Sequence, residues 1–172
     1  LKEIGDEDLI PEEDSLFMLT RGGYIKRMPP ETLKAQKRGG KGLIGMETKE
    51  EDVISQFFIA NTHNDILFFT SSGKVFQTKG HEVPESSRQS KGRALVNFLQ
   101  ISASERITAV VPVSKKDDGN KYLFMTTAAG IIKKVEIDAF VQIRKNGMID
   151  IKLHAGDELR WVEATSGSDQ VV

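Results

Sequence analysis

A short run of cations and glycines at residues 36–42 contains the side chains of this sequence that are best suited to binding a ligand. The run consists of Gln36, Lys37, Arg38, Gly39, Gly40, Lys41 and Gly42. Its three cations repel one another unless an anion lies between them, and its glycines let backbone N–H groups approach that anion closely. Charges and N–H donors of this kind suit a phosphate backbone of any base sequence. The run therefore predicts contact with DNA or RNA, and a solvated turn is the competing interpretation.

Other chemistries have weaker support in the sequence. The chain has no cysteine, and His63, His81 and His154 lie far apart without the spacing of metal ligands, so we expect no metal site. Residues 40–45 match G-x-G-x-x-G, but a dinucleotide site needs a strand before this motif and a helix after it, and neither is predicted here. No nucleophile motif stands out. We expect no catalytic residue and no cofactor in this chain.

The formal net charge of −1 hides two opposed blocks of charge. Residues 1–14 contain seven acids and one lysine, a net charge of −6, which predicts an acidic linker or arm. Competition with a nucleic acid for the basic surface is the alternative for this segment. The remaining residues contain 23 bases and 18 acids, a net charge of +5. The net charge of the whole chain is therefore a poor argument against a nucleic-acid partner.

Length and composition indicate a globular chain of 172 residues, of which 38% are hydrophobic and 28% are charged. No run approaches the roughly 20 apolar residues that span a bilayer, and the acidic start lacks the basic end of a signal peptide. Together with the absence of cysteine, these features predict a cytoplasmic protein without a membrane partner.

The elements that must position the basic run form a repeat. Residues 17–27, 67–77 and 123–134 each read as a strand, a tight turn and a second strand. The predicted turn glycines are Gly23, Gly73 and Gly130, and the threonines aligned before them are Thr20, Thr70 and Thr126. No amphipathic helix of convincing length interrupts this pattern. We therefore expect an all-β chain.

The second half of the repeat also recurs. Acids precede a further apolar strand in each unit, at Glu51 and Asp52, at Glu105, and at Asp157 and Glu158. We expect these acids to accept hydrogen bonds in turns rather than to act as general acids. A basic connection that contains glycine lies between the halves, at residues 36–42, 88–93 and 144–147. About 50 residues with four short strands are typical of a propeller blade.

The repeat predicts a propeller-like fold of four-stranded blades. We place blade one at residues 15–65, blade two at 66–121, blade three at 122–165 and the start of a further blade at 166–172. Blade rings close with about four to eight blades, so three predict a partial ring, and an unpaired last edge would favour association with a second copy. Trp161, the only tryptophan, stands at an apolar strand position and is expected in the core.

The run at residues 36–42, preceded by the hairpin segment 23–27, resembles the signature box of the C-terminal domain of the bacterial DNA gyrase A subunit, whose usual form is Q-R-R-G-G-R/K-G. Lys37 stands where arginine is more usual, so the charge is kept and the planar fork is lost. The resemblance covers the whole chain. It implies a β-pinwheel of six blades, about half of it present here, in which neighbouring blades exchange strands and a basic perimeter wraps DNA.

The resemblance implies that DNA wrapping supports ATP-dependent negative supercoiling by a whole type IIA topoisomerase, an isomerase in which gyrase A and gyrase B subunits form a cytoplasmic, nucleoid-associated heterotetramer. ATP, magnesium and the catalytic tyrosine would lie elsewhere, and this chain by itself would not be an enzyme. Besides the box, the implied DNA contacts are Arg21, Lys26, Arg27, Lys74, Lys79, Arg88, Lys91, Arg93, Lys133, Lys134, Arg144 and Lys145. The alternatives are the C-terminal domain of the topoisomerase IV subunit, whose box is degraded or missing, and a blade-repeat scaffold that binds proteins.

Overall fold

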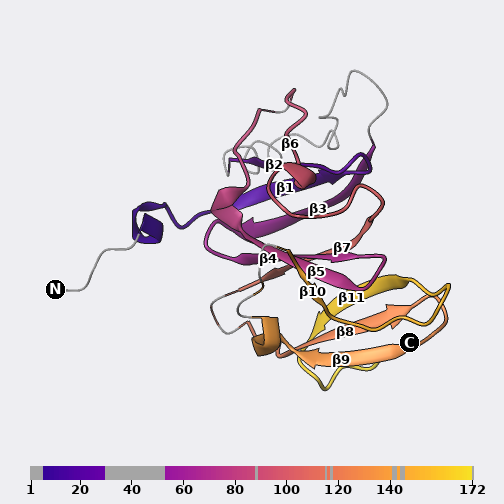
Figure 1. Ribbon diagram of the computed structural model, residues 1–172. Helices are drawn as coiled ribbons and strands as arrows, with labels where there is room; N and C mark the ends of the chain where they lie inside the picture. The colour runs from indigo at the N-terminus through magenta and orange to yellow at the C-terminus, as the bar shows by residue number, and fades with distance from the viewer. Residues whose placement is uncertain are drawn as a thin grey trace, which may run out of the picture. The chain divides into compact units, whose positions relative to one another are not determined.

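The computed structural model describes residues 6–29, 53–87, 89–114, 116, 118–140, 143 and 146–171. Regular structure in these residues is almost entirely β-strand, with short 3-10 helices between strands (Figure 1), which confirms the predicted all-β class. The chain divides into two compact units: unit 1 is Leu1–Asn64 with Lys79–Asn97, and unit 2 is Asp65–Thr78 with Phe98–Val172. None of the helices in the described ranges is long and apolar enough to cross a membrane.

Unit 1 contains one antiparallel sheet with the strand order β3-β1-β2-β6. Its strands are β1 (Asp14–Thr20), β2 (Tyr24–Met28), β3 (Ile54–Asn61) and β6 (Arg93–Ala94), and its 3-10 helices are η1 (Asp6–Leu9), η3 (Gly80–Glu82) and η4 (Leu95–Asn97). Leu16, Met18 and Met28 form a buried apolar cluster. Across the paired strands β1 and β3, the rings of Phe17 and Phe58 stack with their centroids 5.2 Å apart.

Unit 2 contains a four-stranded sheet with the order β10-β5-β4-β7 and a three-stranded sheet with the order β11-β8-β9. Its strands are β4 (Asp65–Thr70), β5 (Lys74–Lys79), β7 (Ile107–Val113), β8 (Tyr122–Thr127), β9 (Ile132–Glu136), β10 (Met148–Ile149) and β11 (Leu159–Thr165), and its 3-10 helix is η5 (Ile137–Phe140). The two sheets share one core, whose buried members include Leu67 and Phe69 of β4, Leu123 and Met125 of β8, and Leu159 of β11.

The three hairpins begin with the same turn. In the first, Gly23 has a φ of 80°, its N–H donates to the Thr20 carbonyl, and Thr20 Oγ1 accepts the N–H of Tyr24. The same features recur at Thr70, Gly73 and Lys74 and at Thr127, Gly130 and Ile131. The threonine of the third turn is therefore Thr127, and the predicted alignment on Thr126 is wrong by one residue.

The recurring acids accept hydrogen bonds in these turns, which confirms the prediction for the two later repeats. Glu105 accepts hydrogen bonds from the hydroxyl groups of Thr70 and Ser72, and Asp157 accepts a turn N–H. Burial acts to raise the pKa of Glu105, but the hydrogen bonds and the charge of Lys74 together hold that pKa below its ordinary value. An ionised carboxylate here accepts hydrogen bonds from the turn and so holds the turn beside the strand that follows the acid.

One of the two outer strands of each four-stranded sheet, β6 or β10, comes from the following repeat. β6 follows β5 in the chain but pairs with β2, and β10 follows β9 but pairs with β5 (Figure 1). Among the described residues, the sheet of β8, β9 and β11 has no such fourth strand. The exchange of strands that the resemblance implied is thus present. It places residues 93–94 in unit 1, although the repeat assigns them to the second blade.

Trp161 is not the core residue that the sequence predicted. Its side chain is 61% exposed, whereas Leu159 and Val162 on the same strand are buried. The register of β11 against β8 shifts between Leu159 and Trp161, which is the mark of a β-bulge. The extra residue moves Trp161 to the opposite face of the strand from Leu159.

Candidate nucleic-acid interface

The predicted DNA contacts divide into those that the structure describes and those that it does not. The residues outside the described ranges are Gln36, Lys37, Arg38, Gly39, Gly40, Lys41, Gly42, Arg88, Arg144 and Lys145, together with the acids Glu51 and Asp52. In the described ranges, no group of three or more histidine or acidic side chains is placed to hold a metal ion. The structural evidence for a nucleic-acid interface therefore comes from the cations in the described ranges.

The second basic loop, comprising the described residues Ser87 and 89–93, lies along β2 of unit 1. Its Arg93 is opposite Ile25 in the strand pair β2–β6. Gly92 has a φ of 84°, and a Cβ at this position would lie 2.4 Å from the Ile25 carbonyl oxygen, so only glycine fits. Lys91 and Arg93 on either side of it are exposed. A backbone in close contact with a sheet thus presents two cations at the surface.

The aromatic ring of Tyr24 supports the first of these cations. The ammonium of Lys91 lies 4.2 Å from the centroid of that ring, the distance of a cation–π contact. The contact leaves the lysine exposed while restricting where its charge lies. The half-buried ring of Tyr24 therefore sets the position of a charge.

Lys26 lies inside unit 1 rather than on the surface where we expected it. Its residue is 1% exposed, and its Nζ donates hydrogen bonds to the carbonyl oxygens of Ser87, at 3.1 Å, and Ser90, at 2.9 Å. Burial lowers the pKa of this ammonium. Both acceptors belong to the second basic loop, so the amine binds that loop.

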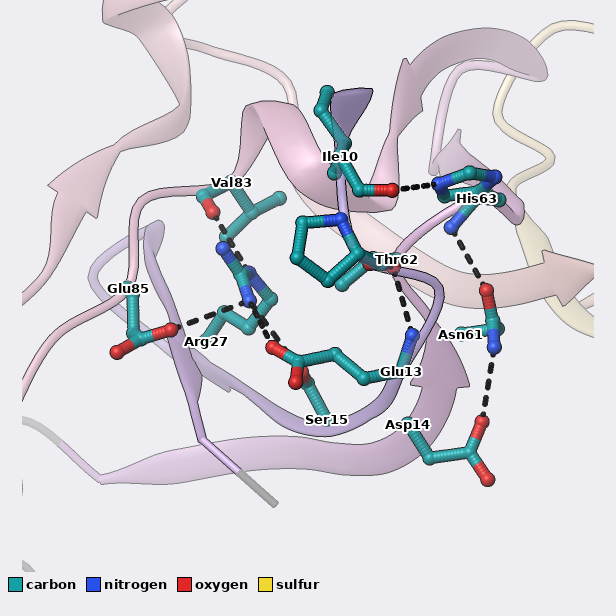
Figure 2. Close-up of polar contacts among 11 residues, drawn as sticks. Ile10, Glu13, Asp14, Ser15, Arg27, Asn61, Thr62, His63, Val83 and Glu85 are labelled. Atoms are coloured by element: carbon teal, nitrogen blue, oxygen red, sulfur yellow. Dashed lines mark hydrogen bonds and ion pairs between the residues drawn. The ribbon is translucent and has the colours of Figure 1, made fainter. Parts of the chain in front are cut away.

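Arg27 also uses its donors within the protein, as Figure 2 shows. Its Nε donates to the Val83 carbonyl at 3.2 Å, and its Nη1 lies 3.5 Å from Glu85 Oε2, 3.4 Å from Ser15 Oγ and 3.9 Å from Glu13 Oε1. Only 12% of the arginine side chain is exposed. Arg27 therefore joins the acidic arm, β1 and the segment that leads into the second basic loop, instead of extending into solvent.

The acidic arm is anchored to unit 1 at its end. Thr62 Oγ1 donates to the Pro11 carbonyl at 2.7 Å, and the Thr62 N–H donates to the Glu13 carbonyl at 2.9 Å. Figure 2 shows the ring of His63 beside the Ile10 carbonyl, with Nε2 2.8 Å from that oxygen. The acidic segment, predicted as a linker or arm, is thus bound to the rest of unit 1 from Ile10 onward.

The cations of β9 differ from those of β2 in their exposure. Lys133 and Lys134 are both exposed. Lys133 donates from its amine to the Asp150 carbonyl, and the ammonium of Lys134 lies 4.7 Å from the centroid of the Tyr122 ring. The pairing of Lys134 with Tyr122 repeats, in unit 2, the contact of a lysine with a tyrosine seen in unit 1.

The remaining described cations lie in turns or at strand ends. Lys74, at the start of β5, has a side chain that is 43% exposed, and its Nζ lies 3.6 Å from Glu105 Oε1. Arg21 is exposed in the β1–β2 turn, and Lys79 is half-buried at the end of β5. These three side chains retain partial or full access to solvent, in contrast to Lys26.

The internal position of Lys26 has a signal in the sequence that charge counting overlooked. Lys26 stands three residues after the turn glycine Gly23, and the second repeat has Phe76 three residues after Gly73. A position that is filled by phenylalanine in one repeat can be a core position in another. The third repeat has the exposed Lys133 at the same position, so comparing the repeats shows that the position can be internal but does not decide it for Lys26.

Known proteins share both the sequence pattern and the fold of this chain. A family model described as "DNA gyrase C-terminal domain, beta-propeller" matches residues 14–61, 64–114 and 121–166. The DNA gyrase A subunit of Ureaplasma parvum serovar 3 is 48% identical over 168 residues, which make up 98% of this chain and 20% of that relative.

Two solved structures have a similar fold. "Structure of DNA gyrase A C-terminal domain" matches with a TM-score of 0.67 at 29% identity and covers 89% of this chain and 48% of the other. "Crystal structure of the C-terminal domain of DNA topoisomerase IV" matches with a TM-score of 0.73 at 24% identity and covers 92% of this chain and 47% of the other. At the lower identity the likeness concerns the fold alone.

Proposed function

The chain belongs to the family of DNA gyrase C-terminal domains, and we propose on this basis that it binds double-stranded DNA through the phosphate backbone and wraps it with little preference for sequence. The observation that carries the proposal is the second basic loop, where Lys91 and Arg93 are exposed beside a glycine packed against β2. Cations on a backbone held by a sheet meet a phosphate with little loss of conformational entropy.

The basic run at residues 36–42 supports the same proposal from the sequence, because it concentrates three cations and three glycines. Bending DNA around a protein costs on the order of several kcal/mol for a few tens of base pairs. Many modest phosphate contacts must therefore act together. A basic connection in every repeat provides such contacts at regular intervals along the chain.

The chain spans about a fifth of the length of the gyrase relative that it matches. For the whole protein we propose the activity implied by the family: ATP-dependent negative supercoiling by a type IIA topoisomerase made of gyrase A and gyrase B subunits. ATP and magnesium would be used by other regions, and the location would be the cytoplasm and nucleoid. In this arrangement the present chain contributes DNA binding and no chemical step.

A salt titration tests the phosphate contacts. Binding of the full chain to a labelled duplex is measured by fluorescence anisotropy from low to moderate salt, for the wild type and for the K37A/R38A/K41A variant. The variant should lower the slope of log affinity against log salt by about 2 to 3, close to one unit for each lost cation. Duplexes of two unrelated sequences should bind with nearly equal affinity.

The matched control is K116A/K121A/K152A, which removes three cations that lie outside the predicted contacts. It should change the slope much less than the first variant. Wrapping itself is tested by relaxing closed circular DNA in the presence of the chain and measuring the change in linking number. Binding that does not respond to salt, or equal effects of the two triple variants, would contradict the proposal and favour a scaffold that binds proteins.

A further inference from the structure

We propose that Lys26 is a positioning residue, whose buried ammonium holds the second basic loop so that Lys91 and Arg93 are presented to DNA, while Lys26 itself touches no phosphate. The part of this inference that concerns DNA rests on the proposed function. The part that concerns the loop rests on the contacts of unit 1 alone. Proteolysis tests the loop contact, and DNA binding tests its consequence.

Hydrogen bonds from Lys26 to Ser87 and Ser90 tie its charge to the loop. Its Nζ lies 3.1 Å from the Ser87 oxygen and 2.9 Å from the Ser90 oxygen, and the residue is 1% exposed. An ammonium removed from water is stable only where dipoles or opposite charges replace its hydration. Because both carbonyl dipoles come from the loop, displacing the loop would leave the buried charge without them. The loop and the lysine therefore stabilise each other.

Neighbouring residues of β2 hold neighbouring parts of the same loop. The ring of Tyr24 lies under the Lys91 ammonium, and the backbone of Ile25 pairs with Arg93. Lys26 adds the hydrogen bonds to Ser87 and Ser90, so its contacts lie on the far side of Lys91 from Arg93 in the sequence. The two exposed cations are thus held from one side by strand pairing and from the other by Lys26.

The second repeat shows that an apolar side chain suffices to fill the same position. Phe76 stands in β5 where Lys26 stands in β2, and a Cβ on Gly147 would lie 2.7 Å from the Phe76 ring. In unit 1, a Cβ on Gly92 would lie 3.0 Å from the Lys26 Cβ. Both residues pack against the glycine of the arriving loop. Filling space does not require a lysine, so the amine adds two directed hydrogen bonds that fix the loop.

Fixing this loop matters because its cations repel each other. Lys91 and Arg93 are two residues apart and both exposed, so their like charges repel each other and oppose a closely packed loop. A loop held in place beforehand loses less entropy when it binds a phosphate backbone. Lys26 is expected to raise DNA affinity by holding the loop in place, without touching DNA itself.

The test compares K26M, which keeps the length of the side chain and removes its charge, with K152M, which removes a charge from an exposed lysine of unit 2. Limited trypsin digestion of the full chain, mapped by mass spectrometry, reports cleavage after Lys91 and Arg93. We expect cleavage there to be about tenfold faster in K26M, as local opening becomes easier, and unchanged in K152M. K26Q keeps two N–H donors and should fall between K26M and the wild type. If K26M does not fold, K26Q carries the test.

DNA binding separates positioning from direct contact. K26M should weaken binding about five- to tenfold, and combining it with K91A/R93A should weaken binding much less than the product of the separate effects, since one loop is lost only once. Unchanged cleavage in K26M would overturn the proposal. So would fully multiplicative effects, which would mean that Lys26 contacts phosphate itself. Faster cleavage in K26M together with no DNA binding by the wild type would support the loop contact and refute the proposed function.

Discussion

β6 in unit 1 and β10 in unit 2 join their sheets in the same way, but the positions of the buried charged residue and the buried apolar residue are interchanged. In unit 1, the receiving strand contributes the charged Lys26, and the residue after the arriving strand is the apolar Leu95. In unit 2, the receiving strand contributes the apolar Phe76, and the residue after the arriving strand is the charged Asp150. Each unit therefore buries a charged residue where the exchanged strand joins its sheet. In unit 1 this residue is on the receiving strand, and in unit 2 it follows the arriving strand.

The backbone contacts of the two exchanged strands match. The N–H of Leu95 donates to the carbonyl of the turn glycine Gly23, and the N–H of Asp150 donates to that of Gly73. A glycine with positive φ precedes each arriving strand, Gly92 in one case and Gly147 in the other. Because backbone pairing is the shared part, strand exchange needs a turn glycine and a loop glycine, and it leaves the buried side chains free to differ.

The two buried charges also differ in how they are compensated. Lys26 donates to two carbonyl oxygens, whereas Oδ2 of Asp150 has no hydrogen-bond partner among the described residues. Burial raises the pKa of Asp150 to about 6, and the charge of Lys133 opposes this rise. Unit 1 thus uses its buried charge to fix a loop, and the buried charge of unit 2 is destabilising at neutral pH.

The largest effect is expected from Phe76→Ala, which removes the buried apolar side chain that the receiving strand of unit 2 contributes. Phe76 is 1% exposed and supports the loop at Gly147, so its loss should lower the free energy of unfolding by about 3 to 5 kcal/mol. Urea unfolding followed by circular dichroism measures this change. Phe57→Ala is the control, because Phe57 is 60% exposed and its loss should have a much smaller effect. Equal costs for both variants would show that Phe76 is not a support of the exchanged strand.

Asp150→Asn is expected to stabilise the protein at neutral pH. A carboxyl whose pKa rises from 3.8 to about 6 on folding binds its proton more tightly in the folded state. The stability it contributes is complete below about pH 4 and is lost as the pH rises through 6, up to about 3 kcal/mol in all. The amide of the variant does not titrate, so the advantage of the variant should grow between pH 4 and pH 7.

Unfolding curves at several pH values measure the effect of Asp150→Asn. The exposed Asp138 provides the control, because Asp138→Asn removes a carboxylate that is not buried and should change the stability much less at neutral pH. An Asp150→Asn profile parallel to the wild type between pH 4 and pH 7 would contradict the assignment of a buried, uncompensated carboxylate.

A smaller effect is expected from Gly92→Ala, which tests the loop glycine of unit 1. A positive φ costs an alanine about 1 to 2 kcal/mol, and the added Cβ would also meet the Ile25 carbonyl oxygen at 2.4 Å. Gly156→Ala is the matched control, since Gly156 has a φ of 80° with no heavy atom within 4 Å of the built Cβ. Thermal unfolding should show a larger loss for Gly92→Ala than for Gly156→Ala. Equal losses would mean that the loop can move away from β2 without cost.

Local patterns in the sequence predicted much of the architecture. The hairpin turns at Gly23, Gly73 and Gly130 are present because a short turn between two strands needs a positive φ that glycine adopts readily. The acids Glu105 and Asp157 accept turn hydrogen bonds as expected. Errors arose where one extra residue changed the register, as at the bulge that exposes Trp161, because a pattern of alternating residues does not reveal a bulge.

The candidate site was less predictable than the fold. Lys26 and Arg27 were grouped with the surface cations because charge usually indicates exposure. In the structure their donors face carbonyls and carboxylates supplied by segments far along the chain, at Val83, Ser87 and Ser90 among others. A lysine is buried only where other segments of the chain supply such acceptors, and a local sequence pattern does not show whether they do.

Residue types at short spacing were enough to predict the repeat, the all-β class and the turn glycines, and the resemblance of the run at residues 36–42 to a known signature box indicated the family. The sheet that each outer strand joins, and the cations that face inward, became known only from the folded chain. The physical reason is that β6 and β10 are strands of two residues each, too short to have a pattern of their own. Their pairing with β2 and β5 is set by turn and loop glycines and by buried side chains contributed from distant parts of the chain.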